Sequence, residues 1–276
     1  MTTTKHEQTR AAWDEIAAGY DRYVTPTHMW LGSEALRRAE VGPGTRLLDV
    51  ACGSGALSIP AARLGARVTA VDQSPVMVER IAARAREEGL SDLVASVMDG
   101  HDLDIEDDRF DVSASQFGVM LFPDLPRGLR ELARVTRPGG RVLMVAYGPP
   151  AGVEFIGVFL EAIAAVVPGF TGLPTDPPPL PFQAAEPARL TRELVAAGLR
   201  DVTLETIVET MAFRSGHQMW DWVVNSNPVG RILVADATPA QRTRIRDGLD
   251  EALRGRAGAD GAAVLRAPVN IAVGTA

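Results

Sequence analysis

The alternation of strand-like and helix-like segments between residues 45 and 148 is the feature that most constrains the fold. Apolar, β-branched runs with the length of buried strands are separated by amphipathic stretches with helix start and stop signals. Such alternation is typical of a mostly parallel sheet, whose right-handed crossovers place helices on both faces. The five strands predicted here span residues 45–51, 66–72, 93–99, 110–116 and 141–148.

Helix boundaries between these strands are clearly marked. Ser74 and Pro75 supply an N-cap and a proline at the first helical position, and Gly89 ends the same helix. Gly65 ends the helix before it. Because ligands of doubly wound sheets bind outside the carboxyl ends of the strands, we expect the functional site at that edge.

The rest of the chain is expected to add a cover and two lid insertions. Residues 1–40, with an amphipathic helix over residues 5–23, form the predicted helical cover, and residues 41–276 form the sheet domain. The insertions are expected at about 149–188 and 213–262, the first with a proline-rich loop over 168–182. Strands at 202–213 and 268–276 bring the predicted α/β, doubly wound, mostly parallel sheet to seven strands. Further helices are predicted at 152–167, 187–199, 217–224 and 239–253.

Composition excludes several classes of function. A net charge of -7 argues against a general nucleic-acid binder, which needs clustered Lys and Arg. The single cysteine, Cys52, excludes an intramolecular disulfide and a multi-cysteine metal site, so we expect no metal. No apolar run is long enough for a membrane span, and the polar start MTTTKHEQTR lacks the core of a signal peptide. The predicted compartment is the cytoplasm.

The stretch LLDVACGSGALSIPAARLG, residues 47–65, joins a strand to a helix through a Gly-x-Gly turn. Glycines permit close approach of a ligand, and the helix N-terminus offers free N–H donors, so the pattern indicates a nucleotide-type ligand. Asp49 stands at the mouth of this turn, where its negative charge would oppose the two phosphates of a dinucleotide. The ligand is therefore expected to carry a positive charge.

Two more carboxylates end the neighbouring predicted strands, at Asp72 and Asp99. A carboxylate at the end of the second strand can accept hydrogen bonds from both ribose hydroxyls of a nucleoside. Asp99 could accept one from the exocyclic amine of adenine. Three carboxylates at successive strand ends repel one another, so a shared ligand with matching donors explains them better than chance does.

Five motifs between residues 10 and 150 closely resemble class I S-adenosylmethionine-dependent methyltransferases, particularly the small-molecule group related to the ubiquinone and menaquinone C-methyltransferases. They are DVACGSG, VDQS, MDG, FDVSASQFGVMLFPD and LARVTRPGGRVLMV. The resemblance implies a Rossmann-like methyltransferase fold and S-adenosylmethionine as cofactor. The cofactor-binding residues that it implies are Tyr20, Asp49, Ala51, Gly53, Gly55, Asp72, Gln73, Met77, Asp99, Gly100 and Gln116.

The resemblance also implies a role for each of these residues. Asp49 and the loop 51–55 would surround the methionine part of the cofactor, whose ammonium carries the expected positive charge. Asp72 would hold the ribose, and Tyr20 would belong to a helix that closes over the cofactor. Gln73 and Met77 would lie beside the nucleoside, Asp99 and Gly100 at the adenine edge, and Gln116 near the methyl donor. Ala51 departs from the family, which often has a third glycine there.

Methyl transfer from a sulfonium is an in-line displacement, so proximity and alignment can supply most of the catalysis. A general base becomes useful when the acceptor must lose a proton. The candidate bases are His28 and His217, with His101 and Tyr147 considered beside them. The candidates for an apolar acceptor pocket are Trp30, Met120, Leu121, Phe122, Tyr147, Phe155, Phe159, Met219 and Trp222.

The predicted function is therefore methyl transfer from S-adenosylmethionine to a small apolar or aromatic acceptor, at oxygen, nitrogen or carbon, in secondary metabolism. The protein is expected to be a monomer or homodimer that binds neither nucleic acid nor membrane. Two alternatives remain open. One is a cofactor-binding regulatory protein without turnover. The other is a nicotinamide-dependent oxidoreductase, which is disfavoured by Asp49 and by Ser58 in place of the third spaced glycine.

Overall fold

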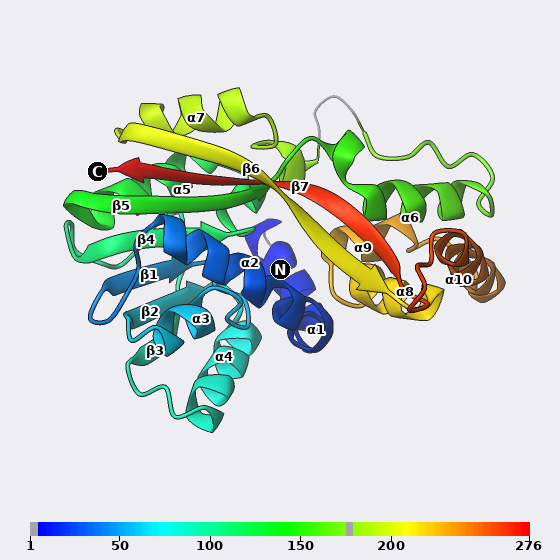
Figure 1. The fold of residues 1–276 in the computed structure, drawn as a ribbon, viewed down its shortest axis with the longest axis horizontal. Helices are drawn as coiled ribbons and strands as arrows, with labels where there is room; N and C mark the ends of the chain where they lie inside the picture. The colour runs from blue at the N-terminus through cyan, green and yellow to red at the C-terminus, as the bar shows by residue number, and fades with distance from the viewer. Residues whose placement is uncertain (1–4, 175–178) are drawn as a thin grey trace.

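A computed structural model describes residues 5–174 and 179–276 and contains one seven-stranded sheet, shown in Figure 1. The strand order is β3-β2-β1-β4-β5-β7-β6, and β7 alone runs antiparallel to its neighbours. The predicted doubly wound, mostly parallel sheet is thus confirmed. The strands are β1 (Arg46–Val50), β2 (Arg67–Asp72), β3 (Leu93–Val97), β4 (Phe110–Gln116), β5 (Thr136–Tyr147), β6 (Arg200–Phe213) and β7 (Ala263–Thr275).

The central strands form the core, and local sequence signals set the helices that cover them. Leu47, Leu48 and the residues 142–146 of β5 are fully buried. At the start of α4 the Ser74 side chain accepts a hydrogen bond from the N–H of Met77, as an N-cap does. The helices connecting the strands are α3 (Ser58–Arg63), α4 (Pro75–Glu87), α5 (Leu125–Val135) and α7 (Pro187–Ala196).

The N-terminal cover is longer than the predicted helix over residues 5–23. It comprises α1 (Lys5–Gly19), a π-helical turn η1 (Tyr20–Val24) and α2 (Thr25–Arg38). Side chains are described from residue 9 onward. π-Helical turns within helices are frequent at functional sites, and this turn carries Tyr20.

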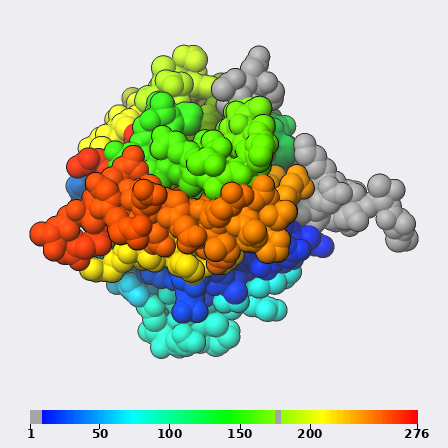
Figure 2. All heavy atoms as spheres, turned by 90° about the vertical axis from the view of Figure 1, so that its right-hand side faces the viewer, coloured from blue at the N-terminus to red at the C-terminus, as the bar shows by residue number. Residues whose placement is uncertain are grey.

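The two predicted insertions come together at one end of the β6–β7 hairpin (Figure 1). They supply α6 (Glu154–Ala164), α8 (Gly216–Val224), α9 (Pro228–Leu233) and α10 (Pro239–Arg254). Helix α10 packs against α6 and α8, and α9 contacts α1 of the cover. Figure 2 views this helical lobe end-on, with α10 in orange between α6 in green and the N-terminal cover in blue. Residues 175–178 of the predicted proline-rich loop lie outside the described residues.

The last strand begins earlier than predicted, at Ala263 instead of Pro268. Residues before Pro268 pair with β6 and not with β5, because the pairing of β7 with β5 ends at Val269. Proline is tolerated where a strand loses a neighbour, so Pro268 does not end β7. Within the described ranges, no helix combines the length and apolar composition needed to cross a membrane.

Candidate functional site

The loop after β1 has backbone angles that favour glycine. Ala51, Gly53 and Gly55 have φ values of 56°, 53° and 101°. A Cβ atom at Gly55 would lie 2.8 Å from Cγ1 of Ile59, so a larger residue would force the packing apart. Ala51 holds the left-handed conformation with a side chain present, and its backbone is therefore strained.

Replacing Ala51 by glycine is expected to raise the free energy of unfolding by up to about 1 kcal/mol. Glycine relieves the left-handed strain, and its greater entropy in the unfolded chain offsets only part of that gain. Urea denaturation measures the change. The control is Ala62→Gly in α3, where glycine should cost about 1 kcal/mol. Equal destabilisation by both substitutions would contradict strain at Ala51.

Asp72, the last residue of β2, joins the loops that follow β1 and β2. Its Oδ2 accepts a hydrogen bond from the N–H of Gly53 and its Oδ1 accepts one from the N–H of Ser74, both at 2.9 Å. Burial of the side chain raises the pKa of Asp72, and these backbone hydrogen bonds oppose that rise. Because each carboxylate oxygen has two lone pairs, Asp72 can also accept hydrogen bonds from a ligand.

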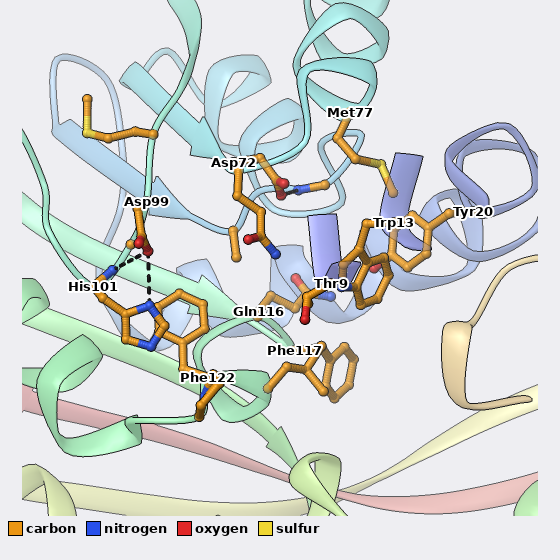
Figure 3. A pocket seen from close by; sticks show the side chains of 18 residues that line it. Thr9, Trp13, Tyr20, Asp72, Met77, Asp99, His101, Gln116, Phe117 and Phe122 are labelled. Carbon is orange, nitrogen blue, oxygen red and sulfur yellow. Dashed lines mark hydrogen bonds and ion pairs between the residues drawn. The ribbon is translucent and has the colours of Figure 1, made fainter. Parts of the chain in front are cut away.

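Asp99 lies on the other side of the site, after β3. Its Oδ1 accepts a hydrogen bond from the backbone N–H of His101 at 2.9 Å and lies 2.9 Å from the ring Nδ1 (Figure 3). The His101 ring stacks on Phe122 with centroids 4.3 Å apart and an angle of 27°. The carboxylate of Asp99 thus lies beside the stacked rings of His101 and Phe122.

Tyr20 and Trp13 of the N-terminal cover close the site from above the glycine loop. A Cβ atom at Gly53 would lie 3.2 Å from Cε1 of Tyr20. The rings of Trp13 and Tyr20 pack edge to face, with centroids 5.9 Å apart. Burial raises the pKa of Tyr20, and the charges of Asp72 and Asp49 raise it further. The cover therefore contacts the loop, and the carboxylates beneath it raise the pKa of its tyrosine.

Polar contacts fasten this cover to α4. Asp21 forms ion pairs with Arg84 and, at 3.3 Å, with Arg80. The hydroxyl of Ser74 donates a hydrogen bond to Asp14. Since α4 begins directly beside Asp72, these contacts hold the cover over the cavity.

Asp21→Asn is expected to weaken binding of a ligand in the cavity about fivefold, the equivalent of about 1 kcal/mol. The substitution removes the charge that both arginines share, so the cover opens more often. Titration calorimetry with S-adenosylhomocysteine measures the change. Glu88→Gln is the control, because its ion pair with Arg63 joins α4 to α3 away from the cover. Equal affinities of the two variants would contradict the role of Asp21.

These parts enclose a cavity of about 190 Å³, which we call the site cavity (Figure 3). The predicted cofactor residues on its wall are Tyr20, Ala51, Gly53, Asp72, Gln73, Met77, Asp99, Gly100 and Gln116. Residues on its wall that were not predicted to bind the cofactor are Thr9, Trp13, Met98, His101, Phe117, Gly118, Leu121, Phe122 and Pro123. The cavity lies at the carboxyl ends of β1 to β4, the edge expected from the topology.

Asp49 and Gly55 do not line the site cavity. Asp49 is 1% exposed, and the hydroxyl of Ser58 donates a hydrogen bond to its Oδ2 at 2.6 Å. Burial raises the pKa of Asp49 to about 7. The expectation that Asp49 stands at the mouth of the turn was wrong: the side chain belongs to the buried end of β1, because all residues from 47 to 50 are buried.

Five aromatic residues pack together beyond Gln116 and form what we call the aromatic cluster. Phe117 stacks on Tyr147 with centroids 4.4 Å apart, Phe155 meets Tyr147 at 6.0 Å and Trp222 at 4.9 Å, and Phe213 meets Trp222 at 6.0 Å. Phe117 has a φ of 58°, which is rare for a bulky residue and marks backbone strain. The predicted acceptor residues Tyr147, Phe155 and Trp222 thus lie together.

His28 and Glu209 meet beside this cluster. His28 Nε2 lies 3.7 Å from Glu209 Oε1, and their side chains are 4% and 2% exposed. The His28 ring lies 4.9 Å from Phe117 and 6.0 Å from Trp222. Burial lowers the pKa of His28 to about 4 and raises the pKa of Glu209 to about 8.

Glu209 was missed in the sequence, although a signal for it exists. In β6 the buried positions are Glu209, Met211 and Phe213, which alternate with exposed residues. A glutamate on the apolar face of an alternating strand breaks the pattern that a half-buried strand follows. The break could have identified this carboxylate.

Two predicted site residues lie on the surface instead. The side chain of His217 is 66% exposed and lies 4.0 Å from Asp250. Trp30 is 53% exposed. The buried face of α2 carries His28, Leu31 and Gly32, and Trp30 lies on the opposite face. Neither residue lines the site cavity or joins the aromatic cluster.

The remaining predicted acceptor residues divide between the core and the cavity. Met120, Phe159 and Met219 are buried in the hydrophobic core. Leu121 and Phe122 line the site cavity instead. In the part of the chain that the structure describes, no three His, Cys, Asp or Glu side chains are grouped as metal ligands would be.

Comparisons with known proteins agree with this geometry. Residues 48–144 match a methyltransferase domain family. An uncharacterized protein of Mycobacterium tuberculosis is 34% identical over 82% of this chain and 80% of its own length. The demethylmenaquinone methyltransferase of a Mycobacterium species is 31% identical over 69% of this chain and 84% of its own length.

A solved structure supports the fold. A putative methyltransferase of Haloferax volcanii, in complex with the Trm112 activator, aligns with a TM-score of 0.58 at 22% identity, over 96% of this chain and 97% of its own. At that identity the likeness concerns the fold alone. The sequence relatives and the matched domain indicate the same family. The glycine loop and the two carboxylates that face one cavity are consistent with it. The chain belongs to the S-adenosylmethionine-dependent methyltransferases.

Proposed function

We propose that S-adenosylmethionine binds in the site cavity with its ribose at Asp72 and its adenine at Asp99, Gly100 and the stacked pair of His101 and Phe122. The lone pairs left on Asp72 suit two ribose hydroxyls. Negative charge around the cavity suits a cation. When bound, the cofactor supplies a methyl group activated by its positively charged sulfur.

The acceptor, we propose further, is a small aromatic molecule that binds between α2, β6 and α8, against the aromatic cluster. One observation carries this proposal. Gln116 and Phe117 line the site cavity, while the Gln116 side chain donates a hydrogen bond to the carbonyl of His28 at 3.0 Å and Phe117 stacks on Tyr147. Two consecutive residues thus connect the cavity to the cluster, and methyl transfer needs such a junction.

Residues of this chain then act by binding and alignment. The loop 51–55 and Asp72 fix the cofactor, and the cover with Tyr20 excludes water from the cavity. Phe117, held in a strained conformation, presents its ring at the boundary between the two ligands. This arrangement supplies proximity, which accounts for much of the rate of a displacement on an activated methyl group.

Calorimetry with S-adenosylmethionine, S-adenosylhomocysteine and NADH tests the cofactor assignment. We expect binding of the first two ligands and none of NADH. Transfer of labelled methyl groups to a panel of small aromatic acceptors tests turnover. Binding without transfer to any acceptor would favour a regulatory protein, and binding of NADH would overturn the assignment of the cavity.

Three further expectations are part of this proposal. We expect the protein to act in the cytoplasm, to bind no nucleic acid and to be a monomer or homodimer. The net charge of -7 supports the second, because binding to phosphates needs an excess of positive charge. Size-exclusion chromatography with light scattering tests the third.

A further inference from the structure

Buried polar atoms without hydrogen-bond partners are concentrated at one place in the molecule. Among the described residues, seven buried side-chain nitrogen and oxygen atoms have no such partner, and five of them belong to His28, Gln116 and Glu209. Leaving a buried polar atom unpaired costs roughly 1–3 kcal/mol. Their concentration therefore points to a polar group of a ligand that pairs with them.

Three different elements hold these side chains together. His28 comes from α2, Gln116 ends β4 and Glu209 lies on the buried face of β6. The amide of Gln116 donates to the carbonyl of His28 at 3.0 Å, which fixes α2 against the sheet. His28 and Glu209 lie 3.7 Å apart, too far for a direct hydrogen bond. An oxygen atom placed between them would lie within hydrogen-bonding distance of both side chains.

The charged surroundings of Glu209 contain no neutralising cation. Within the described ranges, no Lys or Arg lies within ion-pair distance of it, and His28 is its only such neighbour. The titratable groups that face it are His28, Tyr20 and Tyr147. Burial raises the pKa of Tyr147, and the charge of Glu209 adds to that rise, as it also does at Tyr20. With its own pKa raised to about 8, Glu209 titrates near neutral pH, where a general base works best.

We propose that Glu209 is the general base of the methyl transfer and that the acceptor is a small aromatic hydroxyl compound. The inference rests on the proposed function of the adjoining cavity. A hydroxyl group offers one proton and accepts another hydrogen bond. Glu209 accepts the hydroxyl proton, and uncharged His28 donates from Nε2 to the same oxygen. The aromatic cluster packs against the ring of the acceptor.

Protons and charges balance in this step. A lone pair of the acceptor oxygen forms the new bond to the methyl carbon, and the electron pair of the broken carbon–sulfur bond stays on sulfur. The hydroxyl proton passes to the carboxylate of Glu209. One positive and one negative charge disappear together, which favours the step in a site of low dielectric constant. No further reactant is required.

The position of Glu209 couples it to the charge of the cofactor. Tyr20 lines the site cavity, and the charge of Glu209 contributes to the raised pKa of this tyrosine. A positive charge in the cavity therefore stabilises the ionised form of Glu209. S-Adenosylmethionine carries a sulfonium charge that S-adenosylhomocysteine lacks. By linkage, ionisation of Glu209 strengthens binding of the first ligand relative to the second.

Calorimetric titration of both ligands at pH 6 and pH 9 measures this coupling. In the wild type, the ratio of the two affinities is expected to shift about fivefold towards S-adenosylmethionine at pH 9. The amino group of the ligands titrates too, and the sulfonium charge lowers its pKa in S-adenosylmethionine, so the contribution of Glu209 is taken as the difference between the wild type and Glu209→Gln. Glu209→Gln should remove the part of the shift that Glu209 causes and keep the part caused by Asp49, whose pKa burial raises to about 7. The control Glu205→Gln, on an exposed position of the same strand, should keep the whole shift.

Turnover of small phenols and naphthols, followed by release of S-adenosylhomocysteine, tests the base directly. Glu209→Gln is expected to lower kcat about 100-fold or more, with KM changed less than about twofold, and to remove the rise of kcat with pH. Glu209→Asp keeps the carboxylate and should retain part of that rise.

Each outcome of these experiments decides a different claim. A pH dependence of the ratio that is the same in the wild type and in Glu209→Gln, or full kcat in Glu209→Gln, would overturn the base assignment. Cofactor binding without turnover of any phenol or naphthol would overturn the hydroxyl acceptor. Failure to bind either cofactor form would instead overturn the proposed function of the cavity.

Discussion

Replacing Asp72 by alanine is expected to weaken binding of S-adenosylmethionine about 100-fold, the equivalent of about 3 kcal/mol. The carboxylate is buried at the end of β2, and its two oxygens hold the N–H groups of Gly53 and Ser74 at 2.9 Å. Its loss removes the proposed acceptor for two ribose hydroxyls and the hydrogen bonds that hold both loops. Titration calorimetry measures the change.

The comparison of two ligands separates the possible causes of this loss. The ribose is common to S-adenosylmethionine and S-adenosylhomocysteine, so removal of its acceptor should weaken both ligands equally. Loss of affinity for the charged ligand alone would mean that Asp72 acts only through its charge. Asp104→Ala, at an exposed position of the same half of the chain, is the control for general effects on stability.

The parallel half of the fold was predictable because each of its elements carries its own local signal. The strands up to β5 are apolar runs, and α4 has Ser74 at its N-cap, so the sequence alone defines their order. The helical lobe was not predictable as one unit. Its helices come from two insertions far apart in the chain, and α10 of the second insertion packs against α6 of the first.

The position of the site cavity was predictable for a similar reason. Asp72 ends β2 and Asp99 follows β3, and the topology alone brings both to the wall of one cavity. Asp49 has the same position in its strand, yet it is buried and bonded to Ser58. The positions of these residues in the sequence thus predicted correctly at which edge of the sheet the cavity lies. Which carboxylate faces the cavity is decided by packing.

The proposed acceptor side depends on contacts between distant segments. Glu209 lies 181 positions after His28 along the chain, and the two meet only when α2 packs beside β6. Arg38 at the end of α2 and Glu205 of β6 form an ion pair 2.7 Å long on the same side. No periodicity within either segment predicts this pairing, although the buried position of Glu209 in its strand was readable.

Glu209→Gln is expected to stabilise the folded protein at pH 9 by about 3 kcal/mol and to change its stability little at pH 5. Burial raises the pKa of Glu209 from 4.5 to about 8. The folded state therefore holds this proton more tightly than the unfolded state does. The stability that the protonated side chain contributes is complete below pH 4.5 and is lost as the pH rises towards 8.

Urea denaturation of the wild type and Glu209→Gln at both pH values measures the effect. The wild-type curve alone is insufficient, because burial also raises the pKa of Asp49 to about 7 and produces a loss of the same sign. The difference between the two proteins isolates Glu209, and Glu205→Gln should show no such dependence on pH. Destabilisation by Glu209→Gln near pH 6 would mean that a charged His28 already neutralises the carboxylate in the free protein. Its carboxylate would then be held in an ion pair instead of being kept unpaired for the proton of an acceptor.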